Sequence, residues 1–104
     1  MTRKTLLMRL KPGQQMEYER RHNPIWPELQ TVLSKHGIRN YSIFLDRRTD
    51  QVFAYAEIAS EEQWREIAQT EVCRRWWAQM KDLMFTNEDD SPATVVLDEV
   101  FHLE

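Results

Sequence analysis

Two side chains that can exchange protons lie four residues apart in the segment YERRHNPIWPEL, Tyr18 to Leu29. An imidazole gives and takes protons near neutral pH because its ordinary pKa is about 6.5, and a phenol beside it can donate or accept a hydrogen bond. Residues at positions i and i+4 share one face of a helix, so Tyr18 and His22 are expected to point in the same direction. The pair predicts an acid/base site; a core histidine bonded to a backbone carbonyl is the alternative for His22.

Two adjacent tryptophans form a second cluster, in the segment CRRWWAQM, Cys73 to Met80. Successive residues of a helix are rotated by about 100°, so Trp76 and Trp77 cannot both face one core. An indole offers a flat apolar face and one N–H donor, a combination that suits the C–H face of a pyranose ring. Alternatively, Trp76 packs inside and Trp77 seals an edge or a subunit contact. Tyr41, on a predicted strand, reaches the same pocket or packs as strand tyrosines usually do.

Metal and thiol chemistry find little support in the sequence. His22, His36 and His102 share no short metal-ligand spacing, and the single cysteine has no clustered partners. We therefore predict no metal site and no internal disulfide. Cys73 lies beside two arginines, which can activate a thiol, but its place in a helix next to two tryptophans favours inert packing.

The composition argues against several classes of partner. The chain has 104 residues, 14 of them basic and 17 acidic, which leaves a net charge of −3 and no electrostatic footprint for nucleic acid or an anionic membrane. Its apolar runs fall short of the roughly 20 residues of a membrane span, and the start MTRKTLLMRL is not followed by a signal-peptide cleavage site. We predict a single domain over residues 1–104, a cytoplasmic location and a small neutral ligand.

The strands that must position these residues are marked by alternating apolar side chains. They are predicted over four segments: Arg3 to Leu10, Ile38 to Asp46, Val52 to Ile58, and Thr94 to Leu103. The second and third segments are separated by a short polar turn, which predicts an antiparallel hairpin. The first and last segments are apolar on both alternating faces, so both faces of the sheet are expected to be covered.

Two helical regions separate the strands. The first begins near Gln14 and ends before Gly37, with a break at Asn23-Pro24, because proline disfavours a helical conformation in the residue before it. The second begins with a capping box at Ser60 and restarts at Thr70. A polar loop is predicted from Thr86 to Pro92.

The element order, strand, helix, strand, strand, helix, strand, predicts a fold of the α+β class. It is the β-α-β-β-α-β pattern of a ferredoxin-like antiparallel sheet with both helical regions on one face. The other face would then expose a larger apolar patch than monomers usually tolerate. We therefore predict that a second copy covers it, giving a homodimer of the dimeric α/β-barrel type with a pocket between the sheet and helices of each subunit.

Four segments together resemble the L-rhamnose mutarotase family over nearly the whole chain. They are YERRHNPIWPEL (Tyr18 to Leu29), HGIRNYSIFLD (His36 to Asp46), VCRRWW (Val72 to Trp77) and the ending DSP…EVFHL (Asp90 to Leu103). One departure is the pair Asn87-Glu88, where the family has proline after the asparagine. The resemblance implies a dimeric α/β barrel and an isomerase of the aldose 1-epimerase type that needs no cofactor.

The resemblance also implies roles for the residues singled out above. His22 is implied as the proton donor, and Tyr18, Tyr41, Trp76 and Trp77 as the lining of the sugar site. The implied reaction interconverts the α and β anomers of L-rhamnopyranose by opening and reclosing the ring. The group that withdraws the proton from the anomeric hydroxyl, Tyr18 or water, stays open at this point.

Two functions of other classes fit part of the pattern. A cofactor-free monooxygenase on the same dimeric fold would also place histidine, tyrosine and tryptophan in a pocket, but around a flat aromatic substrate. A non-catalytic sugar-binding module would keep the tryptophan platform. Such a module has no use for an acid/base on a buried helical face, so His22 argues against it.

Overall fold

The computed structural model describes all 104 residues and contains one sheet and four helices. The strands are β1 (Thr2–Arg9), β2 (Arg39–Asp46), β3 (Gln51–Ile58) and β4 (Val95–Leu97). The helices are α1 (Gln15–Arg21), α2 (Pro27–Lys35), α3 (Glu61–Ile67) and α4 (Glu71–Met80). The strand order is β2-β3-β1-β4, with every neighbouring pair antiparallel. The predicted α+β class and ferredoxin-like sheet are confirmed.

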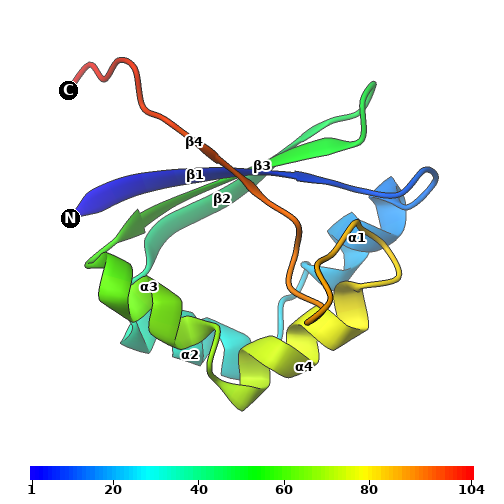
Figure 1. Ribbon diagram of the computed structural model, residues 1–104, viewed down its shortest axis with the longest axis horizontal. Helices are drawn as coiled ribbons and strands as arrows, with labels where there is room; N and C mark the ends of the chain where they lie inside the picture. The colour runs from blue at the N-terminus through cyan, green and yellow to red at the C-terminus, as the bar shows by residue number, and fades with distance from the viewer.

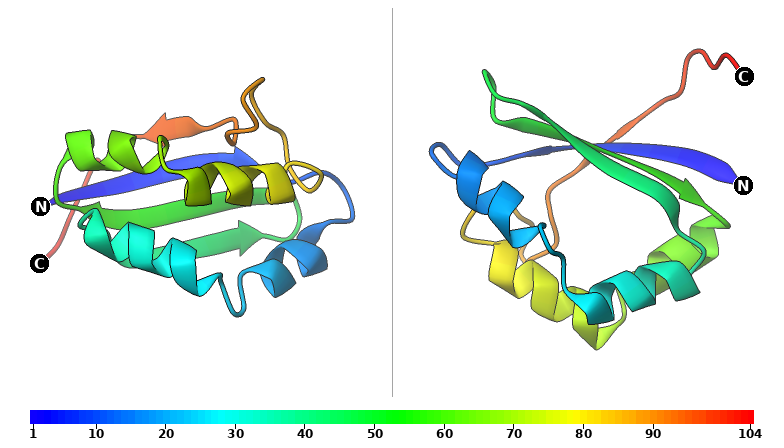
Figure 2. Two further views of the ribbon diagram at one scale, coloured as in Figure 1. Left: turned by 90° about the horizontal axis from the view of Figure 1, so that it is seen from below. Right: turned by 180° about the vertical axis from the view of Figure 1, so that it is seen from behind.

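All four helices lie on one side of the sheet (Figure 1). Seen from that side, α1 and α2 lie over the β2 and β3 half, while α3 and α4 lie over the β1 and β4 half (Figure 2). The chain after β4 leaves the sheet on the side away from the helices. We call the helix side the inner face and the opposite side the outer face.

Strand β3 shows how the sequence separates the two faces. Its residues alternate strictly in burial, because successive side chains of a strand point to opposite sides. Val52, Ala54, Ala56 and Ile58 are buried on the inner face, whereas the residues between them are half-buried on the outer face. The pairing register puts Leu6 and Met8 of β1 and Ile43 and Leu45 of β2 on the inner face as well.

The helix boundaries follow local capping chemistry. The Ser60 and Thr70 hydroxyls accept hydrogen bonds from the backbone N–H groups three residues later, at 3.1 and 3.2 Å, so both predicted helix starts are confirmed. The Asn23-Pro24 break is also present, because α1 ends at Arg21 and α2 begins at Pro27. Proline suits the first position of a helix, where its missing N–H costs nothing.

The last strand is shorter than the sequence suggests, since β4 covers Val95–Leu97 instead of Thr94 to Leu103. The register pairs Leu97 with Thr5, which leaves Glu99 near Arg3, and these two side chains form an ion pair with 2.6 Å between Nε and Oε1. After this ion pair the chain leaves the sheet on the outer side and forms no further strand (Figure 1). Its apolar residues Val100, Phe101 and Leu103 are exposed.

The outer face carries one apolar row that crosses all four strands. Val95 pairs with Leu7, Leu7 with Phe53, and Phe53 with Phe44, in the order β4, β1, β3, β2. Phe44 is 63% exposed and Val95 57% exposed, so nothing in this chain covers the ends of the row. No helix of the chain is long and apolar enough to cross a membrane.

Candidate active site

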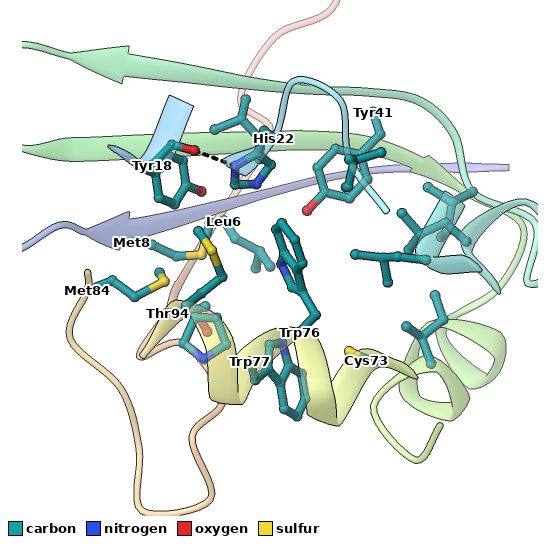
Figure 3. A pocket seen from close by; sticks show the side chains of 18 of the residues that line it. Leu6, Met8, Tyr18, His22, Tyr41, Cys73, Trp76, Trp77, Met84 and Thr94 are labelled. Atoms are coloured by element: carbon teal, nitrogen blue, oxygen red, sulfur yellow. Dashed lines mark hydrogen bonds between the residues drawn. The ribbon is translucent and has the colours of Figure 1, made fainter. Parts of the chain in front are cut away.

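A cavity of about 1050 Å³ lies between the inner face of the sheet and the helices. It is lined from α1 by Tyr18 and His22, from β2 by Tyr41, and from α4 by Cys73, Trp76 and Trp77. Apolar residues such as Leu6, Met8 and Met84 form much of the remaining wall (Figure 3). All five residues that the sequence singled out for a sugar site therefore line one cavity.

The His22 ring is held by its own helix turn. Nδ1 lies 2.8 Å from the Tyr18 carbonyl oxygen, and because a carbonyl can only accept, this nitrogen carries a hydrogen and donates it. The Tyr18 and His22 ring centroids are 4.5 Å apart, so the expectation that they share a face is confirmed. This bond fixes Nε2 of the neutral imidazole as the nitrogen with the free lone pair.

The polar ends of Tyr18 and His22 are open to the cavity. No fully buried side-chain nitrogen or oxygen of this protein lacks a hydrogen-bond partner. The Tyr18 hydroxyl and His22 Nε2 form no hydrogen bond within the protein. Both atoms must therefore be accessible within the cavity, although only 6% of Tyr18 is exposed overall. The backbone bond expected of a core histidine is therefore present at Nδ1. It leaves Nε2 available for a ligand.

Burial sets the protonation of this pair at neutral pH. Loss of solvent lowers the pKa of His22 below its usual 6.5, and the hydrogen bond to the Tyr18 carbonyl opposes part of that change. Burial raises the pKa of Tyr18 well above its usual value. At pH 7 the cavity thus presents a neutral imidazole that can accept a proton and a protonated phenol that can donate a hydrogen bond.

Trp76 is the central aromatic side chain of the cavity. Its ring is edge-on to His22, with centroids 5.2 Å apart, and in Figure 3 the Tyr41 hydroxyl also points toward it. Behind it, Trp26 packs edge-on at 5.1 Å and holds the indole in place. Trp26 therefore packs against the core and supports Trp76. The Trp76 N–H has no partner in the protein and is free for a ligand.

Tyr41 of β2 and Cys73 of α4 also line the cavity. Although 39% of Tyr41 is exposed, its hydroxyl end lies inside the cavity, and burial raises its pKa to about 12. Burial also raises the pKa of the Cys73 thiol to about 11, outweighing the nearby Arg74. The expectation of an unreactive Cys73 agrees with this environment, because the thiolate is the reactive form.

Trp77 lines the cavity differently from its neighbour. It is half-buried between the two apolar clusters of the core, and in Figure 3 its ring lies away from Tyr18 and His22. The structure therefore gathers Tyr18, His22, Tyr41 and Trp76 around one space and places Trp77 at its margin. The predicted splay of the two indoles is confirmed.

The polar margin of the cavity is formed by loop and strand ends. Residues from the loop after α4, including Asn87, Asp90 and Ser91, contribute to it, and a bridge between Thr86 and Pro92 closes this loop. Lysine is absent from the lining, in which Arg39 and Arg47 are the cationic side chains. The chain does not bring three or more potential metal ligands together.

One contributor that the sequence analysis missed is Arg21, next to His22. Its guanidinium reaches from α1 to the last turn of α4, a contact between residues 58 positions apart. The charged residues before His22 indicate that a polar partner lies nearby, but only the tertiary structure identifies it as the Gln79 carbonyl.

A sequence model of the L-rhamnose mutarotase family matches residues 3–103 of this chain. A curated L-rhamnose mutarotase from Tolumonas auensis is 54% identical over 103 residues, which cover 99% of both chains. The crystal structure of an L-rhamnose mutarotase from Formosa agariphila superposes with a TM-score of 0.92 at 36% identity, over 100% of both chains.

More distant structures share the fold alone. A dimeric ferredoxin-like protein from an uncultured marine organism has a TM-score of 0.59 at 15% identity, covering 97% of this chain and 96% of its own. The family model and the full-length relative, by contrast, cover the cavity segments as well as the rest of the chain. The chain belongs to the L-rhamnose mutarotase family.

Proposed function

We propose that this protein interconverts the α and β anomers of L-rhamnopyranose and that His22 moves the proton. The observation that carries the proposal is the His22 geometry. Nδ1 is committed to the Tyr18 carbonyl at 2.8 Å, while Nε2 has no partner and reaches the cavity beside the Tyr18 hydroxyl. A proton-transfer group with one fixed and one free nitrogen is suited to acid/base catalysis near neutral pH.

Ring opening requires one proton to leave the anomeric hydroxyl and one to reach the ring oxygen. In this proposal neutral His22 takes the hydroxyl proton at Nε2, and the resulting imidazolium gives that proton to the ring oxygen as the C1–O5 bond breaks. A single nitrogen can serve both oxygens in turn because both are bonded to C1. Rotation of the aldehyde end and the reverse proton transfers close the ring on its other face.

The proposed role of Tyr18 follows from its burial. Its raised pKa keeps the phenol protonated, so it donates a hydrogen bond to a sugar oxygen instead of acting as the base. Of the two candidates left open by the sequence for the proton acceptor, Tyr18 is therefore disfavoured. Neutral His22 takes that role in the proposal.

The other cavity residues bind the sugar in this scheme. Trp76 offers an indole face and an unpartnered N–H, and the Tyr41 hydroxyl points toward it. An apolar face for the C–H side of the ring and donors for its hydroxyls are the groups that a pyranose site needs. Trp77 borders this space and completes the apolar wall.

We extend the proposal to the reaction class and the assembly. The activity is that of an isomerase of the aldose 1-epimerase type, and the acid/base steps above use no cofactor. The uncovered apolar row Val95, Leu7, Phe53, Phe44 supports a homodimer that buries the outer face. A cytoplasmic location stays a prediction from the sequence, with its single cysteine.

Saturation-transfer NMR between the two anomeric protons of L-rhamnose tests the reaction directly. His22→Asn keeps size and hydrogen-bonding capacity but cannot shuttle a proton, so we expect the enzymatic exchange rate to fall by about 10²-fold or more. The variant should still fold and bind L-rhamnose. Wild-type protein should keep its rate in excess EDTA. An unchanged rate in a folded, sugar-binding variant would make His22 a structural residue.

The pH profile of exchange gives an independent test. The proposal requires neutral His22, and its folded pKa lies below the usual 6.5. The rate should therefore be level through neutral pH and fall only as the pH drops below 6.5. A profile whose acid limb is centred above 6.5 would show that burial does not lower the pKa of the group that controls the reaction.

Incubation of the protein with an electron-rich aromatic substrate under oxygen separates the rival functions. We expect no oxidised product and rapid anomer exchange in the parallel sugar assay. Oxidation of the aromatic compound would favour the monooxygenase, and sugar binding without either activity would favour the non-catalytic module.

A further inference from the structure

Helix α1 carries two of the central cavity residues but has weak intrinsic support. It spans seven residues, and its N-terminus has no side-chain cap. Short helices are marginal without tertiary contacts, so the position of His22 depends on what holds α1 against the rest of the fold. Tyr18 is fixed by its own burial in the core. His22 lies one turn later, at the end of the helix.

Arg21 connects this end of α1 to α4. Its Nη1 donates to the Gln79 carbonyl oxygen at 2.6 Å and lies 3.3 Å from Asp82 Oδ1, while its Nε donates to Glu17 Oε2 at 2.7 Å. Only 18% of the side chain is exposed. One guanidinium therefore joins a carboxylate of α1 to one acceptor in the last turn of α4 and one just after it.

The contact provides a hydrogen-bond donor for the C-terminal end of α4. The last carbonyl groups of a helix have no partner within it, and that end attracts cations. The last turn of α4 contains no basic residue of its own. Beside the C-cap residue Lys81, Arg21 brings a second positive charge to this end from another helix, and its hydrogen bond to the Gln79 carbonyl makes the contact directional as well as electrostatic.

We propose that Arg21 is a positioning residue that sets the distance between His22 and Trp76. Arg21 precedes His22 directly, and Gln79 follows Trp76 by three residues on α4. The guanidinium thus ties the backbone beside the proton-transfer group to the helix that carries the sugar-binding indole, at the 5.2 Å ring separation described above. The proposal rests on the proposed function of His22.

Arg20 provides a matched control within the same helix. It also pairs with Glu17, but its side chain is 70% exposed and makes no contact with α4. Arg20→Met and Arg21→Met therefore remove the same charge from adjacent positions, and only the second removes the link between helices. Arg21→Lys keeps the charge, but one ammonium cannot reproduce the forked contact to both helices.

The kinetic test separates rate from binding. Misplacing a catalytic group by about 1 Å can cost ~10²-fold, so we expect Arg21→Met to lower the exchange rate at saturating L-rhamnose by about tenfold or more. Binding should weaken less than about threefold, because Trp76 and Tyr41 lie on other elements. Arg20→Met should change both by less than about twofold, and Arg21→Lys should be intermediate.

A structural readout makes the outcome independent of the reaction. The nuclear Overhauser effect between the His22 and Trp76 ring protons should be present in wild type and in Arg20→Met, and weakened in Arg21→Met. A lower thermal midpoint with an unchanged rate and Overhauser effect in Arg21→Met would overturn the proposal. If Arg21→Met does not fold, Arg21→Lys provides the test. A wild-type exchange rate and Overhauser effect in Arg21→Lys would overturn the proposal. Failure of the proposed function is recognised separately, since His22→Asn would then exchange anomers normally.

Discussion

The two faces of strand β3 differ in what they offer. The inner face has two alanines, Ala54 and Ala56, between the larger Val52 and Ile58, and all four are buried. The outer face has Phe53, Tyr55 and Glu57, all half-buried. The aromatic side chains of β3 thus lie on the face that the chain leaves uncovered, and its two alanines lie beneath the helices.

This difference shows how a small domain makes room for a ligand. Protein interiors are normally packed to the density of organic crystals, so a cavity has to be built by placing small side chains and spacing the covering helices. Here the inner face supports a cavity of about 1050 Å³, in which we place the proposed active site. The outer face, with its uncovered apolar row, is the surface that we propose a second copy covers.

The largest expected effect is a lower free energy of unfolding when a buried side chain of the inner face is truncated. Ile58 is fully buried, so Ile58→Ala should lower the free energy of unfolding by about 2 to 5 kcal/mol. Denaturant titration followed by circular dichroism measures the change. The loss should be the same at low and high protein concentration. A loss below 1 kcal/mol would contradict the separation into an inner core and an outer surface.

The next effect concerns the outer face. Wild-type protein should have twice the mass of one chain in light scattering at low micromolar concentration. Phe44→Glu places a charge in the apolar row, so the dimer dissociation constant should rise by about 10²-fold or more, since an unpaired buried charge is costly. The monomer should stay folded. A monodisperse wild-type monomer would instead show that the row does not serve dimer formation.

Trp76 and Trp77 are expected to contribute differently to sugar affinity. Trp76→Phe keeps the aromatic face and loses the N–H, and we expect L-rhamnose affinity to fall by about tenfold, the value of one good hydrogen bond. Trp77→Phe, at the margin, should weaken affinity by a smaller factor. Quenching or enhancement of tryptophan fluorescence on sugar addition provides the titration. Equal affinity in both variants and wild type would assign both indoles to packing.

The smallest effect is on stability in acid. The arginines beside Glu17 hold the pKa of its carboxyl near 2, well below the usual 4.5. A lowered pKa in the folded state contributes stability above the usual pKa, and this contribution is lost as the pH falls from about 4.5 toward 2. Glu17→Gln should therefore flatten the dependence of the thermal midpoint on pH in that window. A parallel slope in variant and wild type would show that the pair is not formed in solution.

The sequence predicted the parts of this structure that depend on neighbours along the chain. The caps at Ser60 and Thr70 and the break at Asn23-Pro24 are local, because each involves groups within a few residues. The shared face of Tyr18 and His22 is local for the same reason. These features could be predicted from one sequence because groups only a few residues apart determine them.

Features that depend on partners far along the chain could not be predicted. The segment after Leu97 has strand-forming residues, but the chain leaves the edge of β1 there and forms no further strand (Figure 1). The free nitrogen of His22 depends on a cavity wall made from several elements. Arg21 appeared as one more surface charge, because its acceptors lie 58 and 61 residues away.

The absence of lysine from the cavity lining has a consequence for self-damage. Mutarotation through the open chain exposes a free aldehyde, and aldehydes condense with amines to form imines and then stable glycation products. The lysines of this chain, Lys4, Lys11, Lys35 and Lys81, all lie outside the cavity lining. Its one thiol, Cys73, is held in the protonated form by burial. In the proposed mechanism the open-chain aldehyde therefore forms in a cavity that holds no lysine amine to condense with it.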